Sequence, residues 1–209
     1  GGMFCYQTAA YRRSRDLDSV VTFGSPVDWR GNAPLGVPED VIVNVARFVA
    51  GYVFADHSLP GWMASTGFRL LDPLKTARSQ VRFLRQLHDR EALLGQERQR
   101  RFLAGEGFVA WSGPAIVDML QQVIIQNRMM SGGFVVGDHV VSMGDVTCPV
   151  LAVLGEIDEI GMPGSVRKIA DVAPAADVYE FAVRAGHFGL VVGSTATART
   201  WPVVAEWVR

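Results

Sequence analysis

Apolar residues gather in three short runs of the kind that form buried strands. Residues 20–23 ("VVTF") are β-branched or aromatic and stop at Gly24 and Pro26. Residues 150–154 ("VLAVL") are all apolar, which predicts a strand buried on both faces. Residues 176–183 alternate between apolar and polar, as a strand does.

Helical patterns separate these runs. The spacing predicts helices over 3–14 and 164–174 and a final helix from Pro202, with a small hairpin over 134–143. Strands that alternate with helices favour a parallel sheet covered on both faces. The fold class is therefore predicted to be α/β.

The middle of the chain has a different pattern. Apolar residues recur at helical spacing behind Pro38, a charged helical stretch follows over 72–105, and another helix is expected over 112–133. We expect a helical cap or lid insertion over 36–131. The remaining residues, 1–35 and 132–209, would then form the core.

Composition narrows the class of protein. Hydrophobic residues make up 49% of the chain, charged residues 20%, and the formal net charge is −1. This balance does not favour nucleic acid or an anionic membrane as a partner. No apolar run reaches the roughly 18 residues of a membrane span. Cys5 and Cys148 lie in apolar contexts and are interpreted as core thiols of a cytoplasmic protein. No Cys/His cluster has metal-ligand spacing, so we expect no metal and no cofactor.

Ionisable side chains follow two of the predicted strands. Glu156, Asp158 and Glu159 come after the run 150–154, and His187 comes after 176–183. An aspartate there is often only a turn residue, and a lone histidine is often only packed or exposed. Active groups of parallel sheets nevertheless gather at the carboxyl ends of strands. A carboxylate bonded to one ring nitrogen would leave the other nitrogen to act as a base. We therefore predict Asp158 and His187 as a catalytic pair.

The nucleophile that such a pair would activate is not evident. In α/β-hydrolases it precedes the acid and the histidine, within a G-x-S-x-G elbow or its cysteine version. No such pentapeptide occurs in the 209 residues. If Gly1 is its last glycine, Gly1 and Gly2 open the helix behind the elbow, and the nucleophile stands two positions before residue 1. The chain alone would then be inactive. Alternatively, Gly1 and Gly2 are a cloning remnant ahead of an initiator Met3.

The chain resembles α/β-hydrolases of the poly(3-hydroxyalkanoate) synthase type, especially the synthase-like hydrolase domain that can precede an acyl-CoA ligase. The matching stretches are "GGMFCYQTAAY", "VVTFGSPVDW", "DPLKTA", "NRMMSGGFVVGDHVVSMGDVTCPVLAVLGEIDEIGMP" and "GHFGLVVGS". The resemblance implies the C-terminal part of an α/β-hydrolase fold with a helical cap. It also implies that Asp158 is the acid of a triad and His187 its general base.

Several functions agree with this resemblance. The intact protein would be an acyltransferase, esterase or thioesterase of lipid metabolism, acting on acyl or hydroxyacyl thioesters or esters. Basic residues of 75–101, Arg82 and Arg85 among them, would contact coenzyme A phosphates, unless they form only a solvated helix face. The alternative function is a catalytically silent module for binding or for docking an adjacent acyl-CoA ligase domain.

Overall fold

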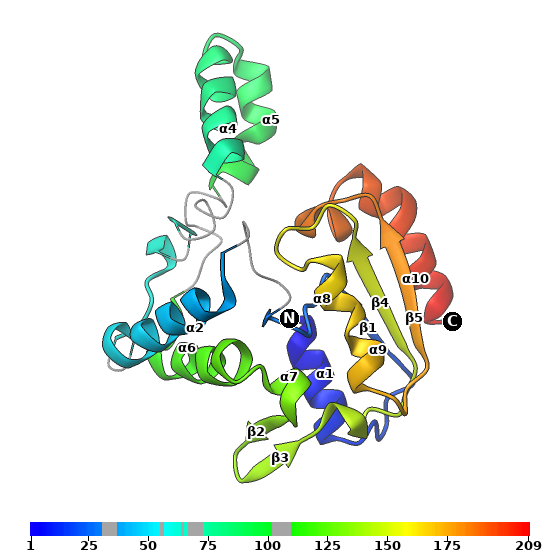
Figure 1. The fold of residues 1–209 in the computed structure, drawn as a ribbon. Coiled ribbons are helices and arrows are strands. Elements are labelled where there is room, and N and C mark those ends of the chain that lie inside the picture. The colour runs from blue at the N-terminus through cyan, green and yellow to red at the C-terminus, as the bar shows by residue number, and fades with distance from the viewer. Residues whose placement is uncertain (31–36, 55–56, 64, 67–72, 102–109) are drawn as a thin grey trace. The chain divides into compact units, whose positions relative to one another are not determined.

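The computed structural model describes residues 1–209 except 31–36, 55–56, 64, 67–72 and 102–109 (Figure 1). The chain divides into two compact units. The first joins Gly1–Ala46 to Gln121–Arg209, and the second is Arg47–Leu120. Both boundaries lie inside the segment 36–131 that the sequence predicts as an insertion.

The first unit is built on a three-stranded parallel sheet in the order β1-β4-β5. The strands are β1 (Val20–Phe23), β4 (Val150–Gly155) and β5 (Val178–Val183). All six residues of β4 are buried, because β4 is paired on both sides and covered on both faces. The predicted strands are confirmed, with β5 beginning two residues later than 176, and the unit is of the α/β class.

Helices cover the two faces of this sheet (Figure 1). On one face, α10 (Trp201–Trp207) packs through Val203, Val204 and Trp207 on a cluster that includes Leu151 and Val153. On the other face lie α1 (Gly2–Tyr11), α8 (Pro163–Arg167) and α9 (Ile169–Val172). Alternate residues of β4 point to opposite faces, so its continuous apolar run serves both layers.

Helix α1 is fixed to β1 by a buried polar contact. Tyr6 is fully buried, and its hydroxyl lies 2.6 Å from Thr22 Oγ1. Burial raises the pKa of Tyr6 to about 12, although the hydrogen bond to Thr22 acts in the opposite direction. Cys5 lies on the exposed side of α1, so its interpretation as a core thiol is wrong, whereas Cys148 is buried. Neither cysteine is in a disulfide.

The hairpin predicted over 134–143 is confirmed. It consists of β2 (Phe134–Val136) and β3 (His139–Val141), which pair antiparallel. Gly137 adopts a positive φ of 59° in the two-residue turn, as the sequence Gly-Asp favours. A 3₁₀ turn (Met143–Asp145) leads from the hairpin towards β4.

The described part of the middle segment is mainly helical. It comprises α2 (Glu39–Phe48), a π-helical turn (Val49–Val53), α4 (Pro73–Arg85), α5 (Arg90–Arg101), α6 (Gly113–Met119), a second π-helical turn (Leu120–Ile125) and α7 (Arg128–Ser131). Only an isolated bridge between Leu59 and Trp111 adds strand-like pairing among these described residues.

Three predicted helices are divided in the structure. The one over 164–174 forms α8 and α9, with Lys168 between them. The stretch 72–105 breaks between α4 and α5, where Asp89 Oδ1 accepts the amide of Ala92 and so caps α5. Residues 72 and 102–105 lie outside the described residues. The stretch 112–133 breaks at Asn127, which is left-handed (φ 46°, ψ 48°).

No helix among the described residues is long and apolar enough to cross a membrane.

Candidate functional site

Asp158 lies in the turn that follows β4. Its amide bonds to the carbonyl of Gly155 at 3.1 Å, so the chain turns sharply at the end of the strand. The carboxylate is buried, and its Oδ1 accepts the amides of Ile160 at 2.9 Å and Gly161 at 2.8 Å. Two backbone donors therefore fix the orientation of this carboxylate. Glu156 and Glu159, from the same loop, are exposed.

His187 lies in the corresponding turn after β5, at the start of a 3₁₀ turn (His187–Leu190). Its Nδ1 lies 2.8 Å from Asp158 Oδ2. The side chain of His187 is 31% exposed, whereas that of Asp158 is fully buried. Because Nδ1 faces a carboxylate, it is the nitrogen that carries the proton. Nε2 has no hydrogen bond to any residue that the structure describes.

Gly24, directly after β1, completes this arrangement. A β-carbon at position 24 would lie 2.6 Å from Asp158 Oδ2 and 2.9 Å from His187 Nδ1, and φ is +52°. Only glycine satisfies both the close approach and this backbone conformation. The sequence indicated a turn at Gly24 but gave no sign of this contact, because it joins residues that are far apart along the chain.

Gly1 and Gly2 open α1 at the same edge of the sheet. Gly1 is the N-cap residue, and Gly2 lies directly against Ser25, where a β-carbon would overlap Ser25 Oγ. Ser25 follows Gly24 in the loop after β1. The start of α1 and the Asp158–His187 pair therefore flank one loop, at the carboxyl end of a parallel sheet.

The other predicted contacts lie in the second unit. Arg82 and Arg85 are exposed on α4. No side-chain hydrogen bond or ion pair joins either guanidinium group to another described residue, and their role as phosphate contacts stays a prediction. Among the described residues, no group of three or more His, Cys, Asp or Glu side chains could hold a metal ion.

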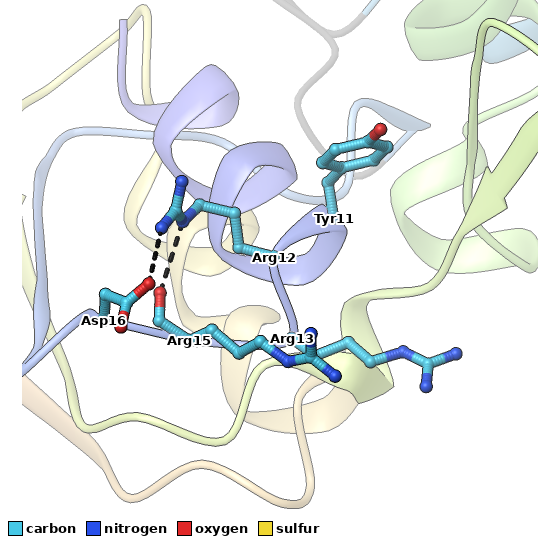
Figure 2. A pocket seen from close by; sticks show the side chains of 5 residues that line it. All are labelled: Tyr11, Arg12, Arg13, Arg15 and Asp16. Carbon is cyan, nitrogen blue, oxygen red and sulfur yellow. Dashed lines mark hydrogen bonds and ion pairs between the residues drawn. The ribbon is translucent and has the colours of Figure 1, made fainter.

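A polar pocket of about 440 Å³ lies elsewhere, at the C-terminal end of α1 (Figure 2). Its lining consists of Tyr11, Arg12, Arg13, Arg15 and Asp16. Arg12 bonds Asp16 Oδ2 at 2.9 Å and the carbonyl of Arg15 at 3.2 Å. The chain enters the amino end of β1 a few residues later, so this pocket is not at the edge that carries Asp158 and His187.

Comparison with known proteins finds distant relatives of one kind. The chain is 28% identical over 151 residues to the poly(3-hydroxyalkanoate) polymerase subunit PhaC of Haloarcula marismortui. The matched region covers 72% of this chain and 31% of that protein. It is 25% identical over 217 residues to PhaC of Allochromatium vinosum, with 100% of this chain and 57% of that protein covered.

PhaC of Synechocystis sp. is also 25% identical, over 224 residues, with 100% of this chain and 55% of that protein covered. The chain thus spans between 31% and 57% of the length of these relatives. No family model matches the chain. By sequence, the chain is similar to poly(3-hydroxyalkanoate) polymerase subunits.

Proposed function

We propose that the chain is part of an acyl-transfer enzyme with an α/β-hydrolase fold, in which Asp158 and His187 assist a serine or cysteine nucleophile. The observation that carries the proposal is the 2.8 Å contact between His187 Nδ1 and the buried Asp158 Oδ2. It supports a histidine held in one tautomer, with Nε2 directed to chemistry. The similarity to polymerase subunits supports acyl transfer as the reaction class.

The proposed reaction follows from these positions. Nε2 of His187 takes the proton of the nucleophile as its oxygen or sulfur attacks the carbonyl carbon of an acyl thioester. The carbon–sulfur bond of the thioester breaks, and Nε2 returns the proton to the leaving thiol. The oxygen of an acceptor hydroxyl then attacks the acyl carbon while Nε2 removes its proton. The bond between the acyl carbon and the nucleophile breaks, and Nε2 returns the proton to the nucleophile. Asp158 stabilises the imidazolium in both halves.

The nucleophile belongs beside the start of α1. Gly2 packs directly on Ser25, and the neighbouring residue Gly24 contacts His187. A side chain at the start of the helix is therefore well placed to approach the imidazole ring. An N-terminal helix end also supplies backbone amides that favour developing negative charge. A hydroxyacyl thioester of coenzyme A is the substrate class we propose, and an adjacent acyl-CoA ligase domain stays a prediction from the resemblance.

The test uses the natural full-length protein with a 3-hydroxyacyl-CoA as substrate and release of coenzyme A as readout. We expect His187→Gln to lower kcat by about 10³-fold or more, and Asp158→Asn to lower it by a similar factor. His139→Gln is the matched control, because His139 is exposed on the hairpin strand β3.

Two results would contradict the proposal. Unchanged turnover in His187→Gln would remove His187 from the chemistry. A folded natural protein that binds the thioester but does not turn it over would instead favour the silent binding module.

A further inference from the structure

Asn127 joins two segments that are far apart in sequence. It lies in the left-handed region between the π-helical turn Leu120–Ile125 and α7, and it is 5% exposed. Its Nδ2 donates to Asp28 Oδ1 at 2.8 Å, and its Oδ1 accepts the amide of Trp29 at 3.3 Å. Both polar ends of the side chain are therefore used on the loop that follows β1.

Asp28 is held from a second direction. Its Oδ1 also accepts the amide of Arg30 at 3.0 Å. Its backbone carbonyl accepts Ser165 Oγ at 2.6 Å, and the amide of Val27 bonds to the carbonyl of Ser165 at 3.2 Å. Ser165 is buried in α8. The loop is thus anchored to α8 as well as to Asn127.

The other end of this loop contacts the Asp158–His187 pair. Gly24 bonds through its amide to the carbonyl of Val153 at 2.8 Å and lies against both side chains of the pair. Gly161 also packs directly on Gly24, because a β-carbon on Gly161 would overlap the carbonyl of Gly24. Every residue from Gly24 to Val27 is buried. The segment 24–28 is therefore short, enclosed and fixed at both ends.

We propose that Asp28 and Asn127 are positioning residues, which hold the Gly24 turn in contact with Asp158 and His187 and so fix the orientation of the imidazole. A loop of five residues that is tied at one end to β4 and at the other to Asn127 has little freedom to move away from the ring. Without the Asn127 contacts, the far end of the loop is held only by Ser165, so the Gly24 turn is fixed less firmly against the imidazole of His187. The inference rests on the proposed function only where it concerns activity.

The test compares three variants. Asn127→Asp places a second carboxylate beside Asp28 and should separate the two segments. Asn127→Gly keeps the left-handed backbone at low cost and removes both hydrogen bonds without adding charge. The double variant Asp28→Asn with Asn127→Asp exchanges donor and acceptor in the bond between these two side chains, and a carboxylate at position 127 can still accept the amide of Trp29, although the bond from the amide of Arg30 to Asp28 Oδ1 is lost.

The readout is the proton on Nδ1 of His187, observed by NMR in the natural full-length protein. We expect its signal to shift or broaden beyond detection in Asn127→Asp and Asn127→Gly, and to return in the double variant. In the natural full-length protein, the single variants should lower kcat roughly tenfold to a hundredfold, with KM little changed, and the double variant should recover most of that loss.

The control is Gln122→Glu. Gln122 makes a comparable cross-link, because it accepts the amide of Val135 at 2.8 Å and donates to its carbonyl at 3.1 Å, but it does not contact the loop 24–28 through these bonds. This variant should lower the melting temperature and leave the His187 signal in place.

The proposal is overturned if folded Asn127→Gly shows the His187 signal of the parent, or if the folded double variant fails to restore it. Because the NMR signal does not depend on turnover, a loss of the proposed acyl-transfer function would leave this result standing. If Asn127→Asp does not fold, Asn127→Gly and the double variant decide.

Discussion

Gly24 touches His187 across the carboxyl edge of the sheet: a β-carbon on Gly24 would lie 2.9 Å from Nδ1 of the ring. The same β-carbon would lie 2.6 Å from Asp158 Oδ2, so the hydrogen bond between the two side chains runs directly beneath this glycine. The pair is therefore enclosed by backbone on the side of β1, which excludes water from one face of the bond without the use of a bulky side chain.

Gly24→Ala should lower the free energy of unfolding by more than the positive φ of Gly24 alone would. We expect a loss of about 3 kcal/mol or more in the free energy of unfolding, because the new methyl group adds a steric clash to the strain of a positive φ. Gly137→Ala is the control, since Gly137 has a similar φ of +59° but no atom within 4 Å of a β-carbon. It should lose only about 1 kcal/mol. Equal losses in denaturant unfolding would show that the clash relaxes at no cost.

Gly2→Ala should separate the start of α1 from the loop after β1. A β-carbon there would overlap Ser25 Oγ and lie 2.8 Å from Ser25 Cβ. We expect a loss of about 1–3 kcal/mol in the free energy of unfolding. Adding Ser25→Gly should recover part of that loss by removing both atoms. Gly164→Ala, in α8, has open space around its β-carbon and should be nearly neutral. Failure of the second substitution to recover any stability would contradict this contact.

Tyr6 predicts a loss of stability at alkaline pH. Its pKa is about 12 in the folded chain because of burial, against an ordinary value of 10. The contribution of the buried, protonated Tyr6 to the free energy of unfolding is fully present below pH 10. Between pH 10 and 12 the unfolded chain releases the phenolic proton and the folded chain retains it, so the free energy of unfolding falls, by roughly 2–3 kcal/mol.

Tyr6→Phe should remove this part of the alkaline decline in denaturant unfolding. It should also cost about 1–2 kcal/mol at neutral pH, because Thr22 loses its hydroxyl partner. Tyr179→Phe, at an exposed position on β5, is the control and should leave both quantities nearly unchanged. An alkaline decline that is identical in Tyr6→Phe and the parent would refute the assignment.

Arg82 and Arg85 give a prediction about substrate. If these exposed residues of α4 meet coenzyme A phosphates, Arg82→Glu combined with Arg85→Glu should weaken acyl-CoA binding to the natural full-length protein about tenfold or more. Hydrolysis of short neutral esters should not change. Arg13→Glu combined with Arg15→Glu makes the same charge change just after the C-terminal end of α1 and should leave acyl-CoA binding nearly intact. Equal binding by the Arg82/Arg85 variant and the parent would reduce these residues to a solvated helix face.

The elements with the strongest local patterns were predictable from sequence. The run 150–154 predicted β4 because a strand buried on both faces needs apolar residues at every position. Gly137 and Asp138 predicted the hairpin because a two-residue turn requires positive φ. The order of Asp158 and His187 on successive strand ends also brought both to one edge, since parallel strands end together.

What sequence did not predict depends on contacts between distant segments. Asn127 ends a helix that the local pattern continues to residue 133, because its side chain bonds to Asp28 and Trp29 rather than to its own helix. The role of Gly24 is hidden for the same reason, because its neighbours are residues 158 and 187. Cys5 was misjudged because an apolar neighbourhood in sequence does not determine which side of a helix faces the core.

Because β4 is the central strand of the sheet, hydrogen exchange at its amides reports on the stability of the whole first unit. Its amides are enclosed between β1 and β5, and all its residues are buried, so no local opening exposes them to solvent. We therefore expect their hydrogen exchange with deuterated water to require global unfolding, and to be the slowest in the unit. Exchange at Val150–Gly155 would then measure the full unfolding free energy, against which opening of the loop 24–28 can be compared under native conditions.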